Sequence, residues 1–520
     1  MSNKGKAIKG GIWFTFFYYL SFGVNFVGNL ILARLLTPND FGTFALALSI
    51  GEILFLLGGF LFSKSYIHLQ DEPDIFETSF TLSCLASIAL FLAGSIIALI
   101  TSNIYSGQVI IFLLVIVAVK GFQYPTNVLL ANYERQFDFK KSGLIFAVAN
   151  ISAMMIAIVV AYFYNTAWSL VIRQILIASV GLSIALILHR NIVKFKINKT
   201  TLKKIWKYSS GIFLSKVTEI LQDRAPRLLL GTFVNTQVLG FFERTQYLSF
   251  YPKRIVNPIS QKVAFSIFSK YKDDKERIRF GLFWNLWLLI RIFLPVGLAL
   301  FLIPEKLILI LLGKQWVEAV PFLKAFSVTL FVLPLRSILI ETFYSLGKTK
   351  LVAKIGSVGV LLVLLSFPVI YHLNLNWSVF VWIISVSFLI QLILFFVSSF
   401  RQKILVKFFR LGGIPLLVGL VLTLIYSVFF GESLFLLFIA LVLYAGINYL
   451  IERNFSIFIH QFDDIKIRLQ VRYNNSCRNG IGFVIDNLSR YFTFSRSELF
   501  PTTGCLHRKG PALWLCNQKP

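Results

Sequence analysis

Five charged side chains share one face of a helix that the sequence predicts inside an apolar run, between residues 208 and 244. At 100° per residue, four of them fall within an arc of roughly 80° and the fifth lies about 60° further round. The group of four consists of Lys216, Glu219, Asp223 and Arg227, and the fifth residue is Arg224. Because a charge near a bilayer centre costs about 2.5–3.5 kcal/mol on insertion scales, we expect this face to line a polar cavity. The alternative is that Lys216–Glu219 and Asp223–Arg227 are ion pairs between packed helices.

Further basic residues lie inside apolar runs, where they could bind an anionic ligand at membrane depth. They are Arg34, Lys120, Arg173, Lys253, Arg254 and Arg291. With Lys216, Asp223, Arg224 and Arg227, they form our set of candidate substrate-binding residues. Arg34 lies near the end of its run, so it could equally extend its side chain to the membrane surface. Lys253 and Arg254 stand between Pro252 and Pro258, which should break their helix.

Two acidic residues are candidates for binding a coupling ion. Glu52 is the lone acid of the second apolar run, and it could carry a proton or pair with one of the cations. Glu219 is the second candidate. The chain has only five histidines, and the apolar runs contain no metal-ligand cluster. We therefore expect no catalytic residues, no metal and no cofactor.

Composition places the chain among membrane proteins. Hydrophobic residues make up 57% of the 520 positions, charged residues only 14%, and the mean hydropathy is +0.76. This is too apolar for a soluble protein of this length. The net charge of +28 does not indicate a nucleic-acid partner, because lysine and arginine are spread among hydrophobic runs. Four cysteines, three of them near the C-terminus, predict no disulfide framework.

Fourteen runs are apolar and long enough, at about 20 residues, to cross a bilayer. They lie near 11–33, 42–63, 79–102, 108–131, 143–163, 167–188, 208–230, 239–266, 281–303, 319–345, 351–371, 378–400, 412–429 and 433–451. The loop 189–207 contains seven basic residues and no acid, whereas 103–107, 164–166 and 372–377 contain no lysine or arginine. This alternation follows the positive-inside rule and places both termini in the cytoplasm. The predicted outer loop 304–318 is an exception with two lysines, which two glutamates accompany.

An internal repeat is indicated by the segments 37–44 and 235–242, which follow the first and seventh runs at a constant offset of 198 residues. Each is a short polar turn with a glycine at the start of the next helix. We therefore predict an all-α polytopic membrane protein with two six-helix lobes and two additional C-terminal transmembrane helices. The predicted parts are an N-terminal lobe (1–188), a basic cytoplasmic linker (189–207), a C-terminal lobe (208–400), two further spans (401–455) and a cytoplasmic tail (456–520).

The tail differs in composition from the rest of the chain. Residues 474–520 are polar and lack periodicity, so we expect disorder there. Cys505, His507 and Cys516 could in principle bind a metal, but three scattered ligands make an unrelated or frame-shifted extension the better interpretation.

Three motifs resemble those of bacterial polysaccharide flippases, which belong to the multidrug/oligosaccharidyl-lipid/polysaccharide exporter superfamily. They are A-R-L-L-T-P-N-D-F-G at 33–42, Y-L-S-F-Y-P at 247–252 and G-K-Q-W-V-E-A-V-P-F-L-K at 313–324. The resemblance covers most of residues 8–400 and does not reach the tail. It implies a V-shaped, two-lobed exporter in the bacterial inner membrane. Its implied substrate is an undecaprenyl-diphosphate-linked oligosaccharide for O-antigen, capsule or exopolysaccharide synthesis.

Two alternatives belong to other functional classes. A drug or cation antiporter of the same superfamily should carry an excess of intramembrane acids, whereas bases dominate here. A membrane polysaccharide polymerase or ligase would usually need a long outer catalytic loop, and the longest one predicted is 304–318. We therefore expect a carrier in contact with membrane lipid, with a polysaccharide polymerase or chain-length protein as its possible partner.

Overall fold

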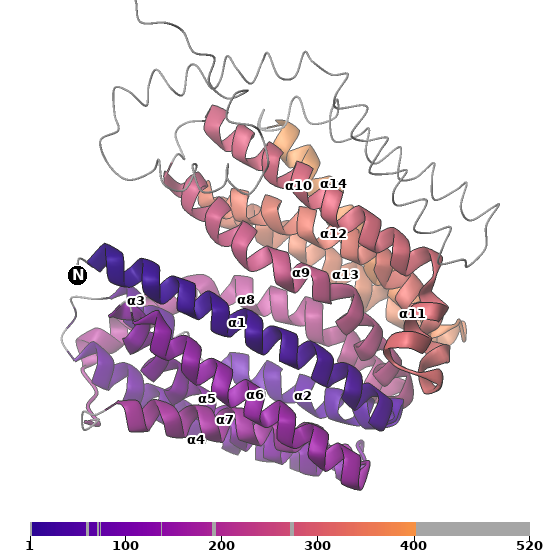
Figure 1. Cartoon of the computed structure of the whole chain (residues 1–520), viewed down its shortest axis with the longest axis horizontal. Helices are drawn as coiled ribbons and strands as arrows, with labels where there is room; N and C mark the ends of the chain where they lie inside the picture. Colours follow the sequence, from indigo (N-terminus) through magenta and orange to yellow (C-terminus); the bar gives the residue numbers. More distant parts are fainter. Residues whose placement is uncertain are drawn as a thin grey trace, which may run out of the picture. The chain divides into compact units, whose positions relative to one another are not determined.

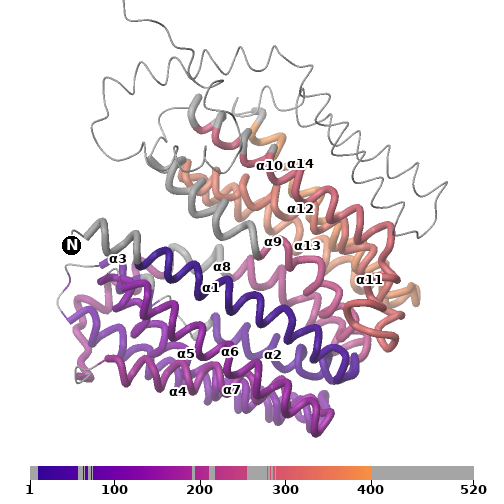
Figure 2. The backbone as a smooth tube through the Cα atoms, in the orientation of Figure 1, coloured from indigo at the N-terminus to yellow at the C-terminus, as the bar shows by residue number. Residues whose placement is uncertain are grey.

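The computed structural model describes residues 3–58, 62–69, 72, 74–136, 138–189, 194–270 and 275–401, in which all regular elements are helical (Figure 1). Six long helices come first: α1 (Asn3–Leu35), α2 (Pro38–Gly58), α4 (Ile75–Ile100), α5 (Gly107–Arg135), α6 (Phe139–Tyr164) and α7 (Trp168–Leu188). Six more follow: α8 (Lys199–Phe233), α9 (Thr236–Lys270), α10 (Lys275–Leu302), α12 (Val320–Ser345), α13 (Thr349–His372) and α14 (Trp377–Arg401). The short elements are α3 (Phe62–His68), α11 (Pro304–Leu311) and the 3₁₀ helix η1 (Lys314–Ala319). Figure 2 follows the backbone through them.

The chain is a multi-pass membrane protein, and its described part is all-α. Nine helices within the described residues are long and apolar enough to cross a bilayer, and a tenth span is possible where α10 and α11 meet at 90°. Each of the twelve runs predicted before residue 401 coincides over most of its length with one long helix, although the run 42–63 extends past the end of α2 at Gly58. The long helices α8 and α9 are not among the nine, and they carry nine and six charged residues respectively. The predicted spans 412–429 and 433–451 and the tail lie outside the described residues.

Two local expectations were wrong. The segment containing Pro252 and Pro258 does not break, because α9 continues as one helix to Lys270. Each proline removes one amide donor, but the neighbouring backbone hydrogen bonds can hold the helix together. The predicted loop 304–318 is not a simple loop either, since it folds as α11 and η1. Both helices are too short to be recognised as spanning runs.

Helix pairing repeats between the two sets of six. In the first set, α1 contacts α6, α2 contacts α5, and α5 contacts both α4 and α7. In the second set, α8 contacts α13, α9 contacts α12, and α12 contacts both α10 and α14. The pair α6 and α7 likewise corresponds to α13 and α14. The same packing arrangement is therefore used twice along the chain.

The helices α2 and α9 cross at the two turns that the sequence repeats. A Cβ atom on Gly42 would overlap the carbonyl oxygen of Thr236, and one on Gly240 would overlap the carbonyl oxygen of Pro38. The contacts are reciprocal, because Thr236 and Gly240 follow Pro38 and Gly42 by the same 198 residues. Only glycine lets the two backbones approach this closely.

Substitution at this crossing should be costly. We expect Gly240→Ala to lower the free energy of unfolding by about 1–3 kcal/mol or more, since backbone atoms must move apart to admit the methyl group. Gly23→Ala on α1 is the matched control, because its Cβ would meet nothing within 4 Å. Heat-induced unfolding of the detergent-solubilised variants measures the difference. Equal stability of the two variants would contradict the close crossing.

The segment before α8 and the first turns of α8 contact the start of α4 and the residues just before it. Lys196 Nζ lies 2.8 Å from Asp74 Oδ2, and Lys204 Nζ lies 2.6 Å from Glu72 Oε2. The hydrogen bond from Lys196 is the main cause of a lowered pKa of the Asp74 carboxyl. The backbone amide of Asn198 also donates to Thr78 Oγ1 at 3.2 Å. These contacts hold the connection between the two sets of helices against the first set.

Candidate functional site

A cavity of about 320 Å³ lies among α1, α2, α6, α7 and α9. Its cationic and amide lining consists of Asn25, Asn29, Arg173, Gln174, Arg244 and Arg254. Its aromatic lining consists of Tyr18, Phe22, Phe41, Phe44, Phe146, Tyr247 and Tyr251, and Glu243 is its one acidic residue. Apolar walls with a few convergent polar groups are typical of binding sites for small molecules or parts of larger ones.

Two asparagines one turn apart on α1 orient two of the arginines. The amide nitrogens of Asn25 and Asn29 donate to the backbone oxygens of Ser21 and Asn25, each at 2.7 Å. Their Oδ1 atoms are thereby free to accept from Arg173 Nη2 at 2.7 Å and from Arg244 Nη1 at 3.2 Å. Because Arg173 comes from α7 and Arg244 from α9, this arrangement brings a residue of each helix set to one wall of the cavity.

Both arginines keep unused hydrogen-bond donors. Arg173 Nε and Arg244 Nε are buried, and within the described part of the chain neither has a partner. The Arg244 guanidinium lies 4.0 Å from the centre of the Phe41 ring, and Arg254 lies 5.4 Å from that of Tyr247. Aromatic rings therefore cover the guanidinium faces, as in cation–π contacts. The donors along the edges of Arg173 and Arg244 suit an anion such as a phosphate.

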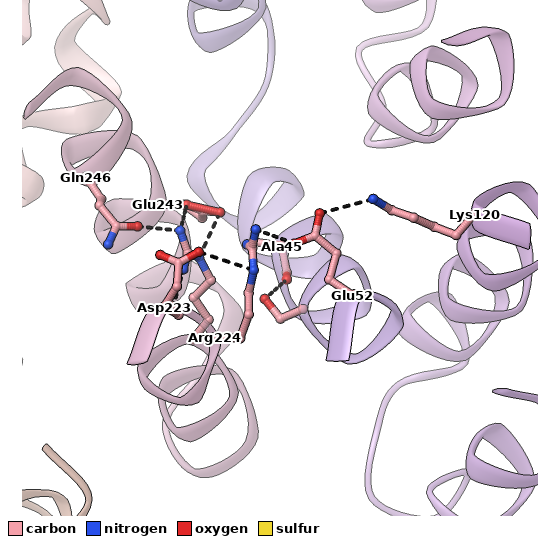
Figure 3. A network of polar contacts seen from close by, with 9 residues as sticks. Ala45, Glu52, Lys120, Asp223, Arg224, Glu243 and Gln246 are labelled. Atoms are coloured by element: carbon pink, nitrogen blue, oxygen red, sulfur yellow. Dashed lines mark hydrogen bonds and ion pairs between the residues drawn. The ribbon is translucent and has the colours of Figure 1, made fainter. Parts of the chain in front are cut away.

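A network of ion pairs runs beside the cavity (Figure 3). Arg227 Nε lies 3.1 Å from Glu243 Oε1, and Arg227 Nη1 lies 2.9 Å from Asp223 Oδ1. Arg224 Nε lies 3.4 Å from Asp223 Oδ2 and also pairs with Glu52. Glu52 Oε1 in turn lies 3.1 Å from Lys120 Nζ. The network therefore connects α2 and α5 of the first helix set with α8 and α9 of the second.

Within this network, Arg227 is satisfied by protein groups. Only 6% of its side chain is exposed, and it contacts two carboxylates and the side-chain oxygen of Gln246. The i,i+4 pair of Asp223 with Arg227, which the sequence offered as the alternative to a cavity lining, is present. Arg227 therefore has less capacity for a ligand than Arg173 or Arg244.

The other predicted residues are dispersed. Arg254 lines the cavity with Arg173, whereas Arg34 donates to the backbone oxygen of Ile310 at the end of α11. Glu219 is exposed on α8, and Lys253 is half-buried on α9. Arg291 is half-buried on α10. The side chain of Lys216 lies outside the described part of the structure.

Sequence reasoning missed Arg244, Asn25 and Asn29. Arg244 is the last residue of the charged stretch 208–244, one position after Glu243, which belongs to the ion-pair network. The two asparagines carry no charge, so they are not among the ionisable residues on which the prediction of the site was based. Their i,i+4 spacing inside an apolar run was the available signal, because it places both amides on one helix face.

The profile of the polysaccharide biosynthesis protein family matches residues 31–321. The chain is 21% identical to the succinoglycan biosynthesis transport protein ExoT of Rhizobium meliloti (strain 1021), over 58% of this chain and 62% of ExoT. It is 22% identical to the lipopolysaccharide biosynthesis protein WzxC of Escherichia coli (strain K12), over 63% of this chain and 68% of WzxC. It therefore aligns with about three fifths to two thirds of the length of these relatives.

Two solved structures share the fold. The lipid II flippase MurJ in an inward closed conformation matches with a TM-score of 0.66 and 14% identity, over 87% of this chain and 99% of MurJ. An inward-facing multidrug resistance transporter of the MATE family matches with a TM-score of 0.58 and 13% identity, over 73% of this chain and 94% of that one. At these identities the similarity concerns the fold.

Proposed function

Because this chain belongs to the polysaccharide biosynthesis protein family, we propose that it is a flippase for lipid-linked oligosaccharides. It would move undecaprenyl-diphosphate-linked repeat units across the bacterial inner membrane for O-antigen, capsule or exopolysaccharide synthesis. The names of ExoT and WzxC, a transport protein and a lipopolysaccharide biosynthesis protein, support this proposal. The observation that carries it is the pair Arg173 and Arg244, which line one cavity and each keep one donor without a partner in the described residues.

In this proposal the cavity shelters the polar head group from hydrocarbon. Arg173, Arg244 and Arg254 bind the diphosphate, because guanidinium groups match phosphate oxygens with paired hydrogen bonds. The neighbouring tyrosines Tyr18 and Tyr247 offer aromatic faces to the first sugar, whereas the hydroxyl of Tyr251 already donates to the backbone oxygen of Phe22 at 2.6 Å. The chain is thus a carrier that binds and releases its substrate without a chemical step.

Glu52 is the better placed of the two candidates for a coupling ion. It contacts both Lys120 and Arg224, so its protonation would release two cations and weaken the connection between α5, α2 and α8. Glu219 is exposed on α8 and lies near Lys253 and Arg336, so it remains the second candidate.

We further propose the complete architecture of two six-helix lobes and two additional spans. Residues 1–188 and 208–400 form the lobes, 189–207 the linker, 401–455 the thirteenth and fourteenth helices, and 456–520 a cytoplasmic tail. The repeated helix pairing and the reciprocal glycine contacts support the two lobes. The charge alternation of the loops supports cytoplasmic termini. A polysaccharide polymerase or chain-length protein is the partner class that fits this role.

Labelling can test the proposed orientation. Single cysteines at Asn198 should react only with reagents that reach the cytoplasm, since this basic segment should remain inside. Cysteines at Gly107 and Asn374 should react with impermeant reagents from outside. External labelling at Asn198 would contradict the fourteen-span arrangement.

The transport proposal is tested by reconstitution. Proteoliposomes containing the protein should move an undecaprenyl-diphosphate oligosaccharide with a fluorescent sugar between leaflets, measured as protection from an impermeant quencher. Empty liposomes are the control. The runner-up function, export of cationic drugs, predicts instead that expression raises drug resistance and that the lipid stays in its original leaflet. The cationic cavity disfavours that alternative.

A further inference from the structure

A second polar cluster lies among α8, α12, α13 and α14. Arg336 on α12 donates from Nε to Gln391 Oε1 on α14 at 2.9 Å, and from Nη2 to Gln222 Oε1 on α8 at 3.1 Å. Its guanidinium also lies 5.5 Å from the centre of the Phe388 ring. These residues are not part of the lining of the central cavity. The cluster is therefore a separate feature of the second helix set.

Both glutamines direct their amide nitrogens to one point on α13. A Cβ atom on Gly359 would overlap Gln391 Nε2 and would lie 2.8 Å from Gln222 Nε2. Both nitrogens are buried, and no acceptor contacts either of them within the residues that the structure describes. A buried donor without an acceptor costs about 1–3 kcal/mol. Two such donors beside one arginine therefore leave a strong requirement for a shared acceptor.

The charge around the cluster is positive. Arg336 and Lys253 lie within electrostatic range of each other, and Glu219 lies within range of both. Asp223 is also near Lys253, but it is already paired with Arg227. Arg254 is a third cation near Lys253, so among these groups three cations face one further carboxylate and leave an excess positive charge. An anionic acceptor satisfies both the amide donors and this excess charge, whereas a water molecule satisfies only the donors.

We propose that Arg336, Gln222 and Gln391 bind a small monovalent anion such as chloride beside Gly359. The amide of Gln391 already fills the place of a side chain at this glycine, which leaves less room than a phosphate group needs, so a single-atom ion is the better fit. The site connects α8, α12, α13 and α14, and its occupancy should stabilise the packing of these four helices. This anion site does not depend on the proposed flippase function. Evidence against the flippase function would leave the anion proposal unchanged.

Thermal unfolding of the purified full-length protein tests the proposal. At constant ionic strength, replacing sodium gluconate by sodium chloride should raise the Tm in a saturable manner, because a ligand that binds only the folded state stabilises it. Arg336→Gln should raise the half-saturating chloride concentration about tenfold or more, the effect of losing a charged hydrogen-bond donor. Arg34→Gln removes a guanidinium from an exposed position and should leave the response unchanged.

A second variant supplies the anion from the protein itself. Gln391→Glu replaces the unpartnered amide by a carboxylate that Arg336 can bind, so the variant should fold and no longer respond to chloride. Its Tm in gluconate should be at least that of the original protein in chloride. Equal Tm values of the original protein in both salts, as expected if only water contacts the two glutamine amides, would overturn the proposal. A chloride response that survives in Gln391→Glu, or that is lost in Arg173→Gln, would overturn it as well.

Discussion

Replacing Arg173 and Arg244 together by alanine is expected to lower the transport rate at least about a hundredfold. Each guanidinium offers charged hydrogen bonds worth about 1.5–3 kcal/mol, and 1.4 kcal/mol corresponds to a tenfold change. Arg→Lys at either position should already impair transport, because a lysine cannot reproduce the paired donors. Transfer of a fluorescent lipid-linked oligosaccharide in proteoliposomes measures the effect.

The matched control is Arg34→Ala. This arginine is exposed and donates to a backbone oxygen of α11, so its loss should leave transport near the original rate. Membrane abundance is scored alongside, and it should not fall in the double variant, since removing charges from a span eases insertion. Transport at the original rate in the double variant would show that the diphosphate binds elsewhere.

The second large effect concerns stability. We expect Glu243→Ala to lower the free energy of unfolding by about 3–5 kcal/mol, because Arg227 would keep its buried charge with fewer partners. Adding Arg227→Met should recover part of this loss, since a pair of apolar groups leaves no uncompensated charge. Thermal unfolding of the solubilised variants is the measurement.

The control for this experiment is Glu305→Ala, which removes an exposed carboxylate at the start of α11. A stable Glu243→Ala protein that has lost transport would assign Glu243 to substrate handling. An unstable protein in which the added methionine recovers nothing would contradict our view that the unpaired charge of Arg227 is the cause.

Much of the fold could be predicted because a long apolar run directly indicates a membrane-spanning helix. The runs near 351–371 and 378–400 differ by only a few residues from α13 (Thr349–His372) and α14 (Trp377–Arg401). Short helices such as α11, with eight residues, are not recognised by a criterion based on 20-residue runs. The course of α9 through Pro252 was missed because proline weakens a helix locally, whereas neighbouring turns and packing decide whether it ends.

The site was harder to predict from the sequence than the fold. The charged face of α8 was visible in the spacing of its residues, but its partners Glu243 and Glu52 lie on α9 and α2. Helix periodicity reports which residues share a face and not which helix that face contacts. The asparagines of α1 were missed for a different reason, since their partners are distant in the sequence. Asn25 accepts from Arg173 of α7, 148 residues away, and Asn29 accepts from Arg244 of α9, 215 residues away.

The crossing of α2 and α9 has the geometry of an isologous interface, in which residue i meets j and j meets i, yet it lies within one chain. In a symmetric homodimer every mutation at such an axis appears twice. Here each half can diverge alone, and one difference is already visible, because the Thr236 hydroxyl donates to Asn39 while its counterpart Pro38 has no hydroxyl to donate. In the proposed carrier, this freedom lets two halves of one architecture present different side chains to the substrate.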